Sequence, residues 1–458
     1  MMKTLDAPKS LTAPHSVLLF DRLRWILDPV GYLEATDHQN QDFFITSGVG
    51  DNIVMTSNPE VMQYILTNDR KLFSSPSTFN RILEPLTGNN SVLGIEGDRH
   101  RRRRQLVMPS FHGDRLSGYG ELIGKLTHQI CDRLPRDQVF SARSVTQQVS
   151  LQVIFEVVFG LSEGSETEAI KHLLTQMADK FSSPLTSALL FFPALQQDWG
   201  SSSPWGAFLR LRQQVDALVY AELARRRAHP DSSRTDILSL LMAAHDENGQ
   251  PMSDNELRDE IMALLFAGHE TTATAMAWGL YWLHKNPQVK TKLLSELDSL
   301  DPDIDPMTLA RQPYLTAVCQ ETLRRSPVAM LTFPRMAEEP VEIKGYRFEA
   351  GTIFMGCMYL TLQRDDLYPN PQEFCPERFL ERKYSPFEFI PFGNGARRCV
   401  GEALALYEMK LVLATVVKHY RLELADPRPE VARRRGVTLA PARGVQMTML
   451  GKREQSAG

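Results

Sequence analysis

The chain has 458 residues, of which 43% are hydrophobic and 23% are charged, and this composition is typical of a globular protein with a large core. The formal net charge of -4 gives no basic excess, so the composition does not favour a nucleic-acid partner. Five scattered cysteines argue against a disulfide framework and indicate a reducing compartment.

The N-terminal region resembles neither a secretory signal nor a membrane span. Residues 1–16 have no apolar core, and Asp21, Arg22 and Arg24 interrupt the apolar stretch 17–27. A spanning helix takes ~20 apolar residues. We therefore expect a soluble cytoplasmic protein without a transmembrane segment, and peripheral membrane contact is left open.

The predicted elements begin with a hairpin. Residues 42–46 and 52–56 are β-prone, and the turn-prone segment 48–51 lies between them. From 58 to about 300, apolar residues recur at three- and four-residue spacing, which predicts a succession of helices. After about 339 the sequence changes to short strands and Pro-rich loops.

The longest predicted helix begins at a capping box formed by Ser253 and Glu256 and runs to about Lys285. Its middle is apolar nearly all round, as expected of a helix that crosses the interior. We predict one α+β fold, mainly α with a small β portion. It is a single domain over 1–458, with an N-terminal extension of about 1–15 and a flexible C-terminal tail of about 452–458.

The strongest motif is a cysteine in a glycine-rich loop, Phe392-Gly-Asn-Gly-Ala-Arg-Arg-Cys399-Val-Gly401, just before a predicted helix. Backbone amides and a helix N-terminus stabilise a thiolate there. Such a thiolate can ligate haem iron and favour O–O cleavage. The alternative for an isolated cysteine is an inert buried thiol.

This loop resembles that of the cytochrome P450 family, Phe-x-x-Gly-x-Arg-x-Cys-x-Gly, with every fixed position present. The resemblance covers nearly the whole chain. It implies the P450 fold, with haem b (iron protoporphyrin IX) between the long central helix and the cysteine loop. Cys399 would be the iron ligand, and Phe392 would contact the haem.

Glu321 and Arg324 lie at i and i+3, which alone indicates an ordinary surface pair. The resembling family has Glu-x-x-Arg here, joined in a buried charge network by the arginine of a Pro-Glu-Arg-Phe segment, which implies Arg378. One departure is Gln363, where many members carry histidine.

The long helix contains the segment Ala267-Gly-His-Glu270-Thr271-Thr272. A threonine can hydrogen-bond a carbonyl one turn back and open the helix. The resemblance implies that Glu270 and Thr271 are catalytic and deliver protons during dioxygen activation. The alternative is a glycine kink with a satisfied threonine.

Haem carries two propionates, whose charge needs fixed donors. By position in the family's patterns, these donors would be His100, Arg104, Arg335 and Arg397. The neighbouring arginines 101, 102 and 103 are expected to be solvated, although periodicity cannot choose which arginines face inward.

The segments expected over the haem are apolar and imply a hydrophobic substrate. The expected pocket residues are Phe266, Ala267, Val328, Ala329, Met330, Leu331 and Leu439. The stretch 97–113 resembles soluble cyanobacterial members of the family, which are associated with fatty acids, alkanes and terpenoids. The apolar stretch 185–193, followed by Trp199 and Trp205, is expected to form an entrance channel, a membrane contact or plain helix packing.

No flavin or nicotinamide fingerprint is present, so electrons would come from a separate ferredoxin or flavodoxin. An acidic partner would suit a basic face formed by Arg101, Arg102, Arg398 and Lys410. The expected activity is therefore that of a haem-thiolate monooxygenase acting on dioxygen, in a monomer. A peroxide-using or rearranging enzyme and a haem gas sensor are the alternatives, and neither would need the Glu270–Thr271 pair.

Overall fold

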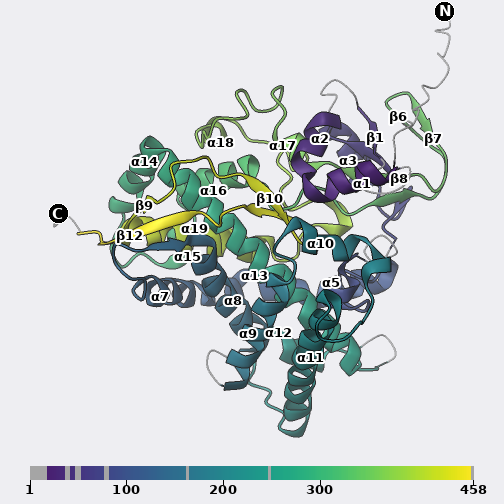
Figure 1. Cartoon of the computed structure of the whole chain (residues 1–458), viewed down its shortest axis with the longest axis horizontal. Helices are drawn as coiled ribbons and strands as arrows, with labels where there is room; N and C mark the ends of the chain where they lie inside the picture. The colour runs from purple at the N-terminus through teal and green to yellow at the C-terminus, as the bar shows by residue number, and fades with distance from the viewer. Residues whose placement is uncertain are drawn as a thin grey trace, which may run out of the picture.

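The structure is a computed structural model that describes residues 18–36, 42–46, 53–76, 82–160, 165–245 and 249–454. Figure 1 shows a largely helical body, with β1, β6, β7 and β8 at the upper right and β9, β10 and β12 across the left and middle. The predicted class, mainly α with a small β portion, is confirmed. The predicted N-terminal extension, the turn 48–51 and the last four residues of the predicted tail lie outside the described residues.

The α-helices among the described residues are α1 (Leu18–Leu27), α2 (Pro29–Thr36), α3 (Pro59–Thr67), α4 (Glu84–Thr87), α5 (Gly97–Val107), α6 (Gly113–Gly118), α7 (Gly120–Cys131), α8 (Ala142–Phe159), α9 (Ser165–Asp179), α10 (Pro184–Phe191), α11 (Pro204–Ala228), α12 (Ile237–Ala243), α13 (Asp254–Lys285), α14 (Pro287–Asp298), α15 (Pro306–Leu309), α16 (Pro313–Arg325), α17 (Met358–Leu362), α18 (Arg378–Glu381) and α19 (Glu402–His419). Short 3₁₀ helices are η2 (Met108–Phe111), η3 (Pro193–Leu195) and η4 (Gly395–Arg397).

The strands are β1 (Phe44–Thr46), β2 (Ile53–Thr56), β3 (Phe73–Ser74), β4 (Val139–Ser141), β5 (Arg335–Ala337), β6 (Val341–Ile343), β7 (Tyr346–Phe348), β8 (Ile353–Gly356), β9 (Tyr420–Leu424), β10 (Ala432–Arg435), β11 (Thr438–Pro441) and β12 (Gln446–Lys452).

The largest sheet has the strand order β1-β2-β8-β5-β3. The predicted hairpin pairing is confirmed, because β1 and β2 are antiparallel with Phe44 opposite Met55. Strand β2 also pairs in parallel with β8, where Ile53 lies opposite Ile353. This sheet therefore joins strands near the N-terminus to the segment 335–356.

The long predicted helix is α13, whose boundaries match the prediction. The Ser253 hydroxyl accepts from the Glu256 amide, and the Glu256 carboxylate accepts from the Ser253 amide, so the capping box is present. Helix α13 packs along α8 and α19, and most of its residues are buried. This central position places its middle across a cavity from the cysteine loop.

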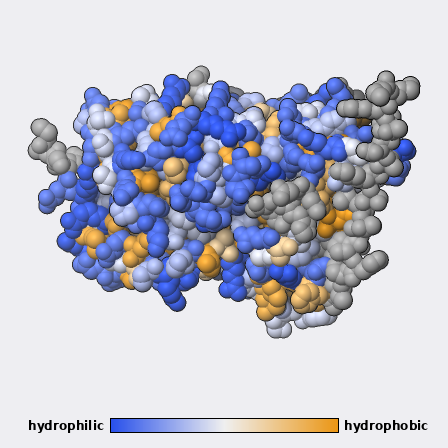
Figure 2. Space-filling model, turned by 90° about the horizontal axis from the view of Figure 1, so that it is seen from above, coloured by the Kyte–Doolittle hydropathy of each residue, from blue (hydrophilic) through white to orange (hydrophobic). Residues whose placement is uncertain are grey.

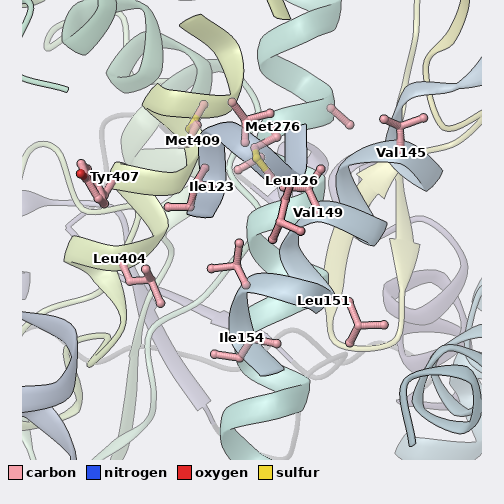
Figure 3. Packing of buried hydrophobic residues seen from close by; sticks show 14 of the residues in the cluster. Ile123, Leu126, Val145, Val149, Leu151, Ile154, Met276, Leu404, Tyr407 and Met409 are labelled. Carbon is pink, nitrogen blue, oxygen red and sulfur yellow. The ribbon is translucent and has the colours of Figure 1, made fainter. Parts of the chain in front are cut away.

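Figure 3 shows how α7, α8, α13 and α19 share one core, with Ile123 and Val149 beside Met276 and Met409. Each of these four side chains is at most 1% exposed. Burying one such side chain stabilises the fold by about 1.5–3 kcal/mol, so this packing fixes α13 and α19 relative to each other.

The face of the molecule in Figure 2 is mostly hydrophilic, with hydrophobic residues in small separate groups. No helix within the described ranges is long and apolar enough to cross a membrane.

Candidate active site

A cavity of about 390 Å³ lies between α13, the cysteine loop (Pro391–Gly401) and the start of α19. Residues from α4, α5, α9 and α10 and the segment 328–333 complete its wall. The lining is mainly apolar, and Cys399 is part of it. Segments far apart in the sequence thus converge on one thiol.

The cysteine loop is tightly turned. The Cys399 amide donates to the Phe392 carbonyl at 3.0 Å, and the left-handed φ angles of Gly393 and Gly395 (65° and 70°) make this possible. A Cβ at Gly395 would lie 2.5 Å from the Leu66 carbonyl oxygen. Only glycine fits at this position.

The Cys399 side chain is accessible from the cavity, although it lies deep in the protein. Burial raises the pKa of its thiol to about 11, while the Gly401 amide and the charges of Arg104 and Arg398 oppose this rise. A thiolate therefore needs a further positive charge beside the sulfur, such as a ligated iron provides.

A cationic cluster borders the cavity beside the cysteine loop. His100, Arg104, Arg397 and Phe392 line the cavity. Burial, followed by the charges of Arg397, Arg104, Arg70 and Arg335, lowers the pKa of His100 to about 3. The electrostatic environment is thus strongly positive, which favours anionic groups.

Arg335 is 1% exposed and is not among the lining residues; it lies behind the wall in an ion pair with Asp69, at 2.9 Å between Nη2 and Oδ2. The same carboxylate oxygen accepts from the Ala396 amide at 2.8 Å. Asp69 therefore connects Arg335 with the cysteine loop. No short-range sequence pattern indicates this contact.

These residues fit a haem. The charges of two propionates would be balanced by Arg104, Arg335 and Arg397, and the neutral His100 would donate a hydrogen bond to them. Over the described ranges, no three His, Cys, Asp or Glu side chains are grouped to hold a metal ion. Cys399 in the cavity wall offers a thiolate ligand, which suits an iron whose other ligands come from a macrocycle.

The expectation that Arg103 is solvated is wrong. Arg103 is 5% exposed and donates to Glu260 at 2.9 Å and to Glu256 at 3.1 Å. Helical spacing explains this, since Arg103 lies three residues after the buried His100 and so on the same side of α5. Arg101 is exposed, as expected, and pairs with Asp98.

Glu270 and Thr271 are both part of the cavity wall. The Thr271 hydroxyl donates to the Ala267 carbonyl at 2.5 Å, the contact that the sequence predicts. Glu270 accepts from Arg143, from Gln147 at 2.8 Å and from Arg435 at 3.2 Å. Burial raises the pKa of Glu270, but the charges of Arg143, His269 and Arg435 outweigh burial and lower it overall.

Glu321, Arg324 and Arg378 are brought together in one buried cluster. Arg324 donates to both carboxylate oxygens of Glu321, at 2.7 and 2.8 Å, and Arg378 donates at 3.2 Å. The side chains of Glu321 and Arg324 are fully buried. Gln363, the departure from the family pattern, donates to the Arg324 carbonyl at 3.0 Å.

The predicted pocket residues Phe266, Ala267, Val328, Ala329 and Leu331 line the cavity. Met330 and Leu439 do not, so their prediction is corrected: both are buried in a separate core with Trp25 and Tyr32. The extended backbone explains the difference, because neighbouring residues 329, 330 and 331 point to alternate sides.

The residues of the apolar stretch 185–193 lie in different surroundings. Leu190 lines the cavity, while Leu185 is 75% exposed. Of the two tryptophans, Trp205 is buried against Phe208 and Trp199 is 73% exposed. One side of α10 thus borders the cavity and the other faces outward.

Comparisons with known proteins agree with this site. The family model "Cytochrome P450" matches residues 31–448. Two relatives from Mycobacterium tuberculosis carry the names "Putative cytochrome P450 135B1" and "Putative cytochrome P450 138". The first is 32% identical over 407 residues, 89% of this chain and 84% of the relative. The second is 32% identical over 403 residues, 87% of this chain and 86% of the relative.

A solved structure of cyanobacterial CYP120A1 with retinoic acid bound has the same fold. It superimposes with a TM-score of 0.80 at 24% identity and covers 93% of this chain and 96% of the other. The family-model match over residues 31–448 shows that this chain belongs to the cytochrome P450 family of haem-dependent monooxygenases.

Proposed function

We propose that this cytochrome P450 hydroxylates a hydrophobic substrate such as a fatty acid, an alkane or a terpenoid, with Cys399 as the iron ligand. The observation that carries the proposal is the mainly apolar cavity that reaches from Cys399 past Phe266 to Phe181 and Leu190. An apolar cavity favours an apolar substrate and gives few polar contacts to orient it. Retinoic acid, which the CYP120A1 structure holds, is one long apolar molecule to include in a substrate screen.

The haem would supply dioxygen activation, and the residues of this chain would hold it and move protons. Arg104, Arg335 and Arg397 would balance the charge of the propionates, and His100 would donate a hydrogen bond to them. The wall formed by Val328, Ala329 and Leu331 would exclude water and press the substrate toward the haem.

Glu270 and Thr271 would deliver protons to the cavity. Arg435 donates to Glu270 and, at 2.6 Å, to Asp179, whose side chain is 58% exposed. Arg435 thus links the exposed Asp179 to Glu270, which lies next to Thr271 in the cavity wall. Proton transfer to or from a positioned carboxyl group typically contributes about 10²–10⁴-fold to rate.

Electrons would come from a separate ferredoxin or flavodoxin. Arg101 and Arg398 have exposed fractions of 52% and 47%, and Arg398 adjoins Cys399. Basic side chains beside the thiolate loop would suit an acidic partner. Lys410 contributes less, since burial lowers its pKa and it is only half-exposed. A monomeric, cytoplasmic protein occupying 1–458 as one domain stays a prediction.

The first experiment is the absorption spectrum of the reduced, purified protein with carbon monoxide, for the wild type and Cys399→His. We expect a strongly red-shifted Soret band in the wild type that is lost in Cys399→His. A well-folded, haem-loaded wild type without this band would contradict thiolate ligation. Fatty acids, alkanes and terpenoids are then screened for spectral shifts and for product.

A peroxide-using or rearranging enzyme is the alternative. It would form product without an electron donor, whereas the proposed hydroxylase requires both dioxygen and the donor. The Glu270–Thr271 pair at the cavity favours the hydroxylase over this alternative and over a haem gas sensor.

A further inference from the structure

The segment Gly88–Leu93, here called the cavity loop, follows α4 and precedes α5. Val92 and Leu93 line the cavity, as do Leu86 and Thr87 just before the loop. The loop contains no helix or strand. Its position must therefore be fixed by contacts with other parts of the chain.

The first contact that holds the cavity loop in place is made by Asp259 on α13. Its Oδ2 accepts from the Asn90 backbone amide at 3.0 Å and from the Asn90 side-chain amide at 2.9 Å. The loop approaches this carboxylate so closely that a Cβ at Gly88, whose φ is 72°, would lie 2.1 Å from Asp259 Oδ1. Glycine at 88 thus permits the contact that Asp259 makes.

The second contact is made by the next residue of α13, Glu260. Its Oε2 accepts from the Val92 amide at 2.9 Å and from Arg103 at 2.9 Å, and Arg103 also donates to the Asn90 carbonyl at 3.0 Å. Glu260 is fully buried, and its Oε1 has no hydrogen-bond partner among the described residues. The Glu260 carboxylate therefore connects the cavity loop, through Val92, with Arg103.

The far end of the loop is held from the other side of the cavity. Arg397, a member of the cationic cluster, donates to the Val92 carbonyl at 3.0 Å and to the Ile95 carbonyl at 2.7 Å. The amide and the carbonyl of Val92 are thus both bonded to charged side chains. The backbone of Val92 is therefore held by Glu260 of α13 at its amide and by Arg397 of the cysteine loop at its carbonyl.

We propose that Asp259, supported by Glu260, is a specificity-determining positioning residue of this enzyme. Neither side chain lines the cavity. They act through the cavity loop, by setting how far Val92 and Leu93 reach into the space for an apolar substrate. The inference rests on the proposed function, because it assumes a haem and a hydrophobic substrate in this cavity.

Removing the Asp259 carboxylate would leave the Asn90 amide without its acceptor and loosen the loop. These donors are only partly buried, and a hydrogen bond to a charged group is worth about 1.5–3 kcal/mol, so the lower value, about tenfold in an equilibrium constant, is expected. A ligand that contacts the loop would lose affinity, while a ligand that touches only the haem would not.

The test uses the haem-loaded full chain and two probes that ligate haem iron, imidazole and 1-dodecylimidazole, each titrated by absorption. We expect Asp259→Ala to weaken binding of 1-dodecylimidazole by about tenfold and that of imidazole by less than twofold. Asp259→Asn keeps one acceptor oxygen and should restore part of the affinity. The matched control is Asp254→Ala, on the same helix but paired with Arg227 on α11.

Asn90→Ala approaches the same contact from the loop and removes only one of the two donors, so it should weaken 1-dodecylimidazole by a smaller factor. Amide hydrogen exchange over 88–93 should be faster in Asp259→Ala than in Asp254→Ala. The inference is overturned by unchanged affinity for both probes, or by an equal loss for both probes. A wild type that binds no haem would instead contradict the proposed function.

Discussion

Glu321 and Glu270 are each held by two arginines, but the two clusters differ in their surroundings. The side chain of Glu321 has no exposed surface. Its partner Arg324 also donates hydrogen bonds to the backbone carbonyls of Leu362, Pro371 and Glu373. Glu270 is 14% exposed and borders the cavity, and its partner Arg435 leads to the exposed Asp179. The first arrangement holds the scaffold, whereas the second connects the surface with the cavity.

Glu256 extends this comparison toward solvent. It also pairs with two arginines, Arg99 and Arg103, but its side chain is 25% exposed. Breaking an ion pair lowers the free energy of unfolding most when the remaining charge is buried and cannot be hydrated. The three carboxylates should therefore rank by burial.

The largest effect is expected at Glu321. Glu321→Ala leaves Arg324 and Arg378 as buried charges without a carboxylate, so the free energy of unfolding should fall by about 3–5 kcal/mol. Urea unfolding and haem content measure the loss. Glu373→Ala is the control, because only its backbone carbonyl accepts from Arg324. Equal stability of the two variants would contradict the proposed role of Glu321 in stabilising the fold.

A smaller loss of stability, about 1–3 kcal/mol, is expected for Glu270→Gln, since its arginines are partly reached by water. Product formed per electron consumed should fall about tenfold or more, because the carboxylate beside Thr271 is gone. The ratio is measured with a reconstituted electron donor. Asp179→Asn, at the exposed end of the ion pairs of Arg435, should lose less than half as much stability; if it proved the more damaging change, the ranking by burial would fail.

Thr271→Ala should change stability by less than about 1 kcal/mol, because one hydrogen bond to Ala267 is lost. Haem binding should persist while product per electron falls several-fold. Thr274→Ala, on the same helix but outside the cavity wall, is the matched control. An unchanged product yield per electron in Thr271→Ala would show that its role is assigned wrongly.

The smallest effect is expected at Glu256 and depends on pH. Burial raises the pKa of this carboxyl, but the hydrogen bonds from Arg99 and Ser253 and the charge of Arg103 outweigh burial and lower the pKa to about 2. A carboxyl with a lowered pKa stabilises the fold above its ordinary pKa of 4.5, and this stabilisation is lost as the pH falls toward 2.

Glu256→Gln should therefore be less stable than the wild type by about 1 kcal/mol or less at neutral pH, and the difference should shrink below pH 4.5. Unfolding midpoints across this range measure it. A difference that grew with acidity would have the wrong sign for this ion pair.

Local patterns were sufficient for much of the fold. The capping box of Ser253 and Glu256, the ends of α13 and the hairpin pairing of β1 with β2 depend on residues close in sequence. The motifs around Cys399 and Glu321 were found in the same way. These features follow from hydrogen bonds and periodicities that span a few residues.

Apart from the contact of Arg378 with Glu321, which the family resemblance implied, contacts between distant segments could not be predicted. The partners of Glu270 are Arg143 and Arg435, which lie 127 and 165 residues away. The burial of Arg103 required knowing that α5 packs against the acids of α13. The position of Met330 required the side to which each residue of an extended segment points. Such placements are decided by tertiary packing.

The parallel pairing of β2 with β8 has a consequence for synthesis. Ile53 meets Ile353, so the ribosome must add 300 residues after the first strand before its partner exists. At about 5–20 residues per second, that takes roughly 15–60 s. During this time the inner edge of β2 is unpaired, and unpaired strand edges promote aggregation. Expression conditions that slow elongation, or that limit chaperones, should therefore reduce the yield of folded protein by acting on this one strand.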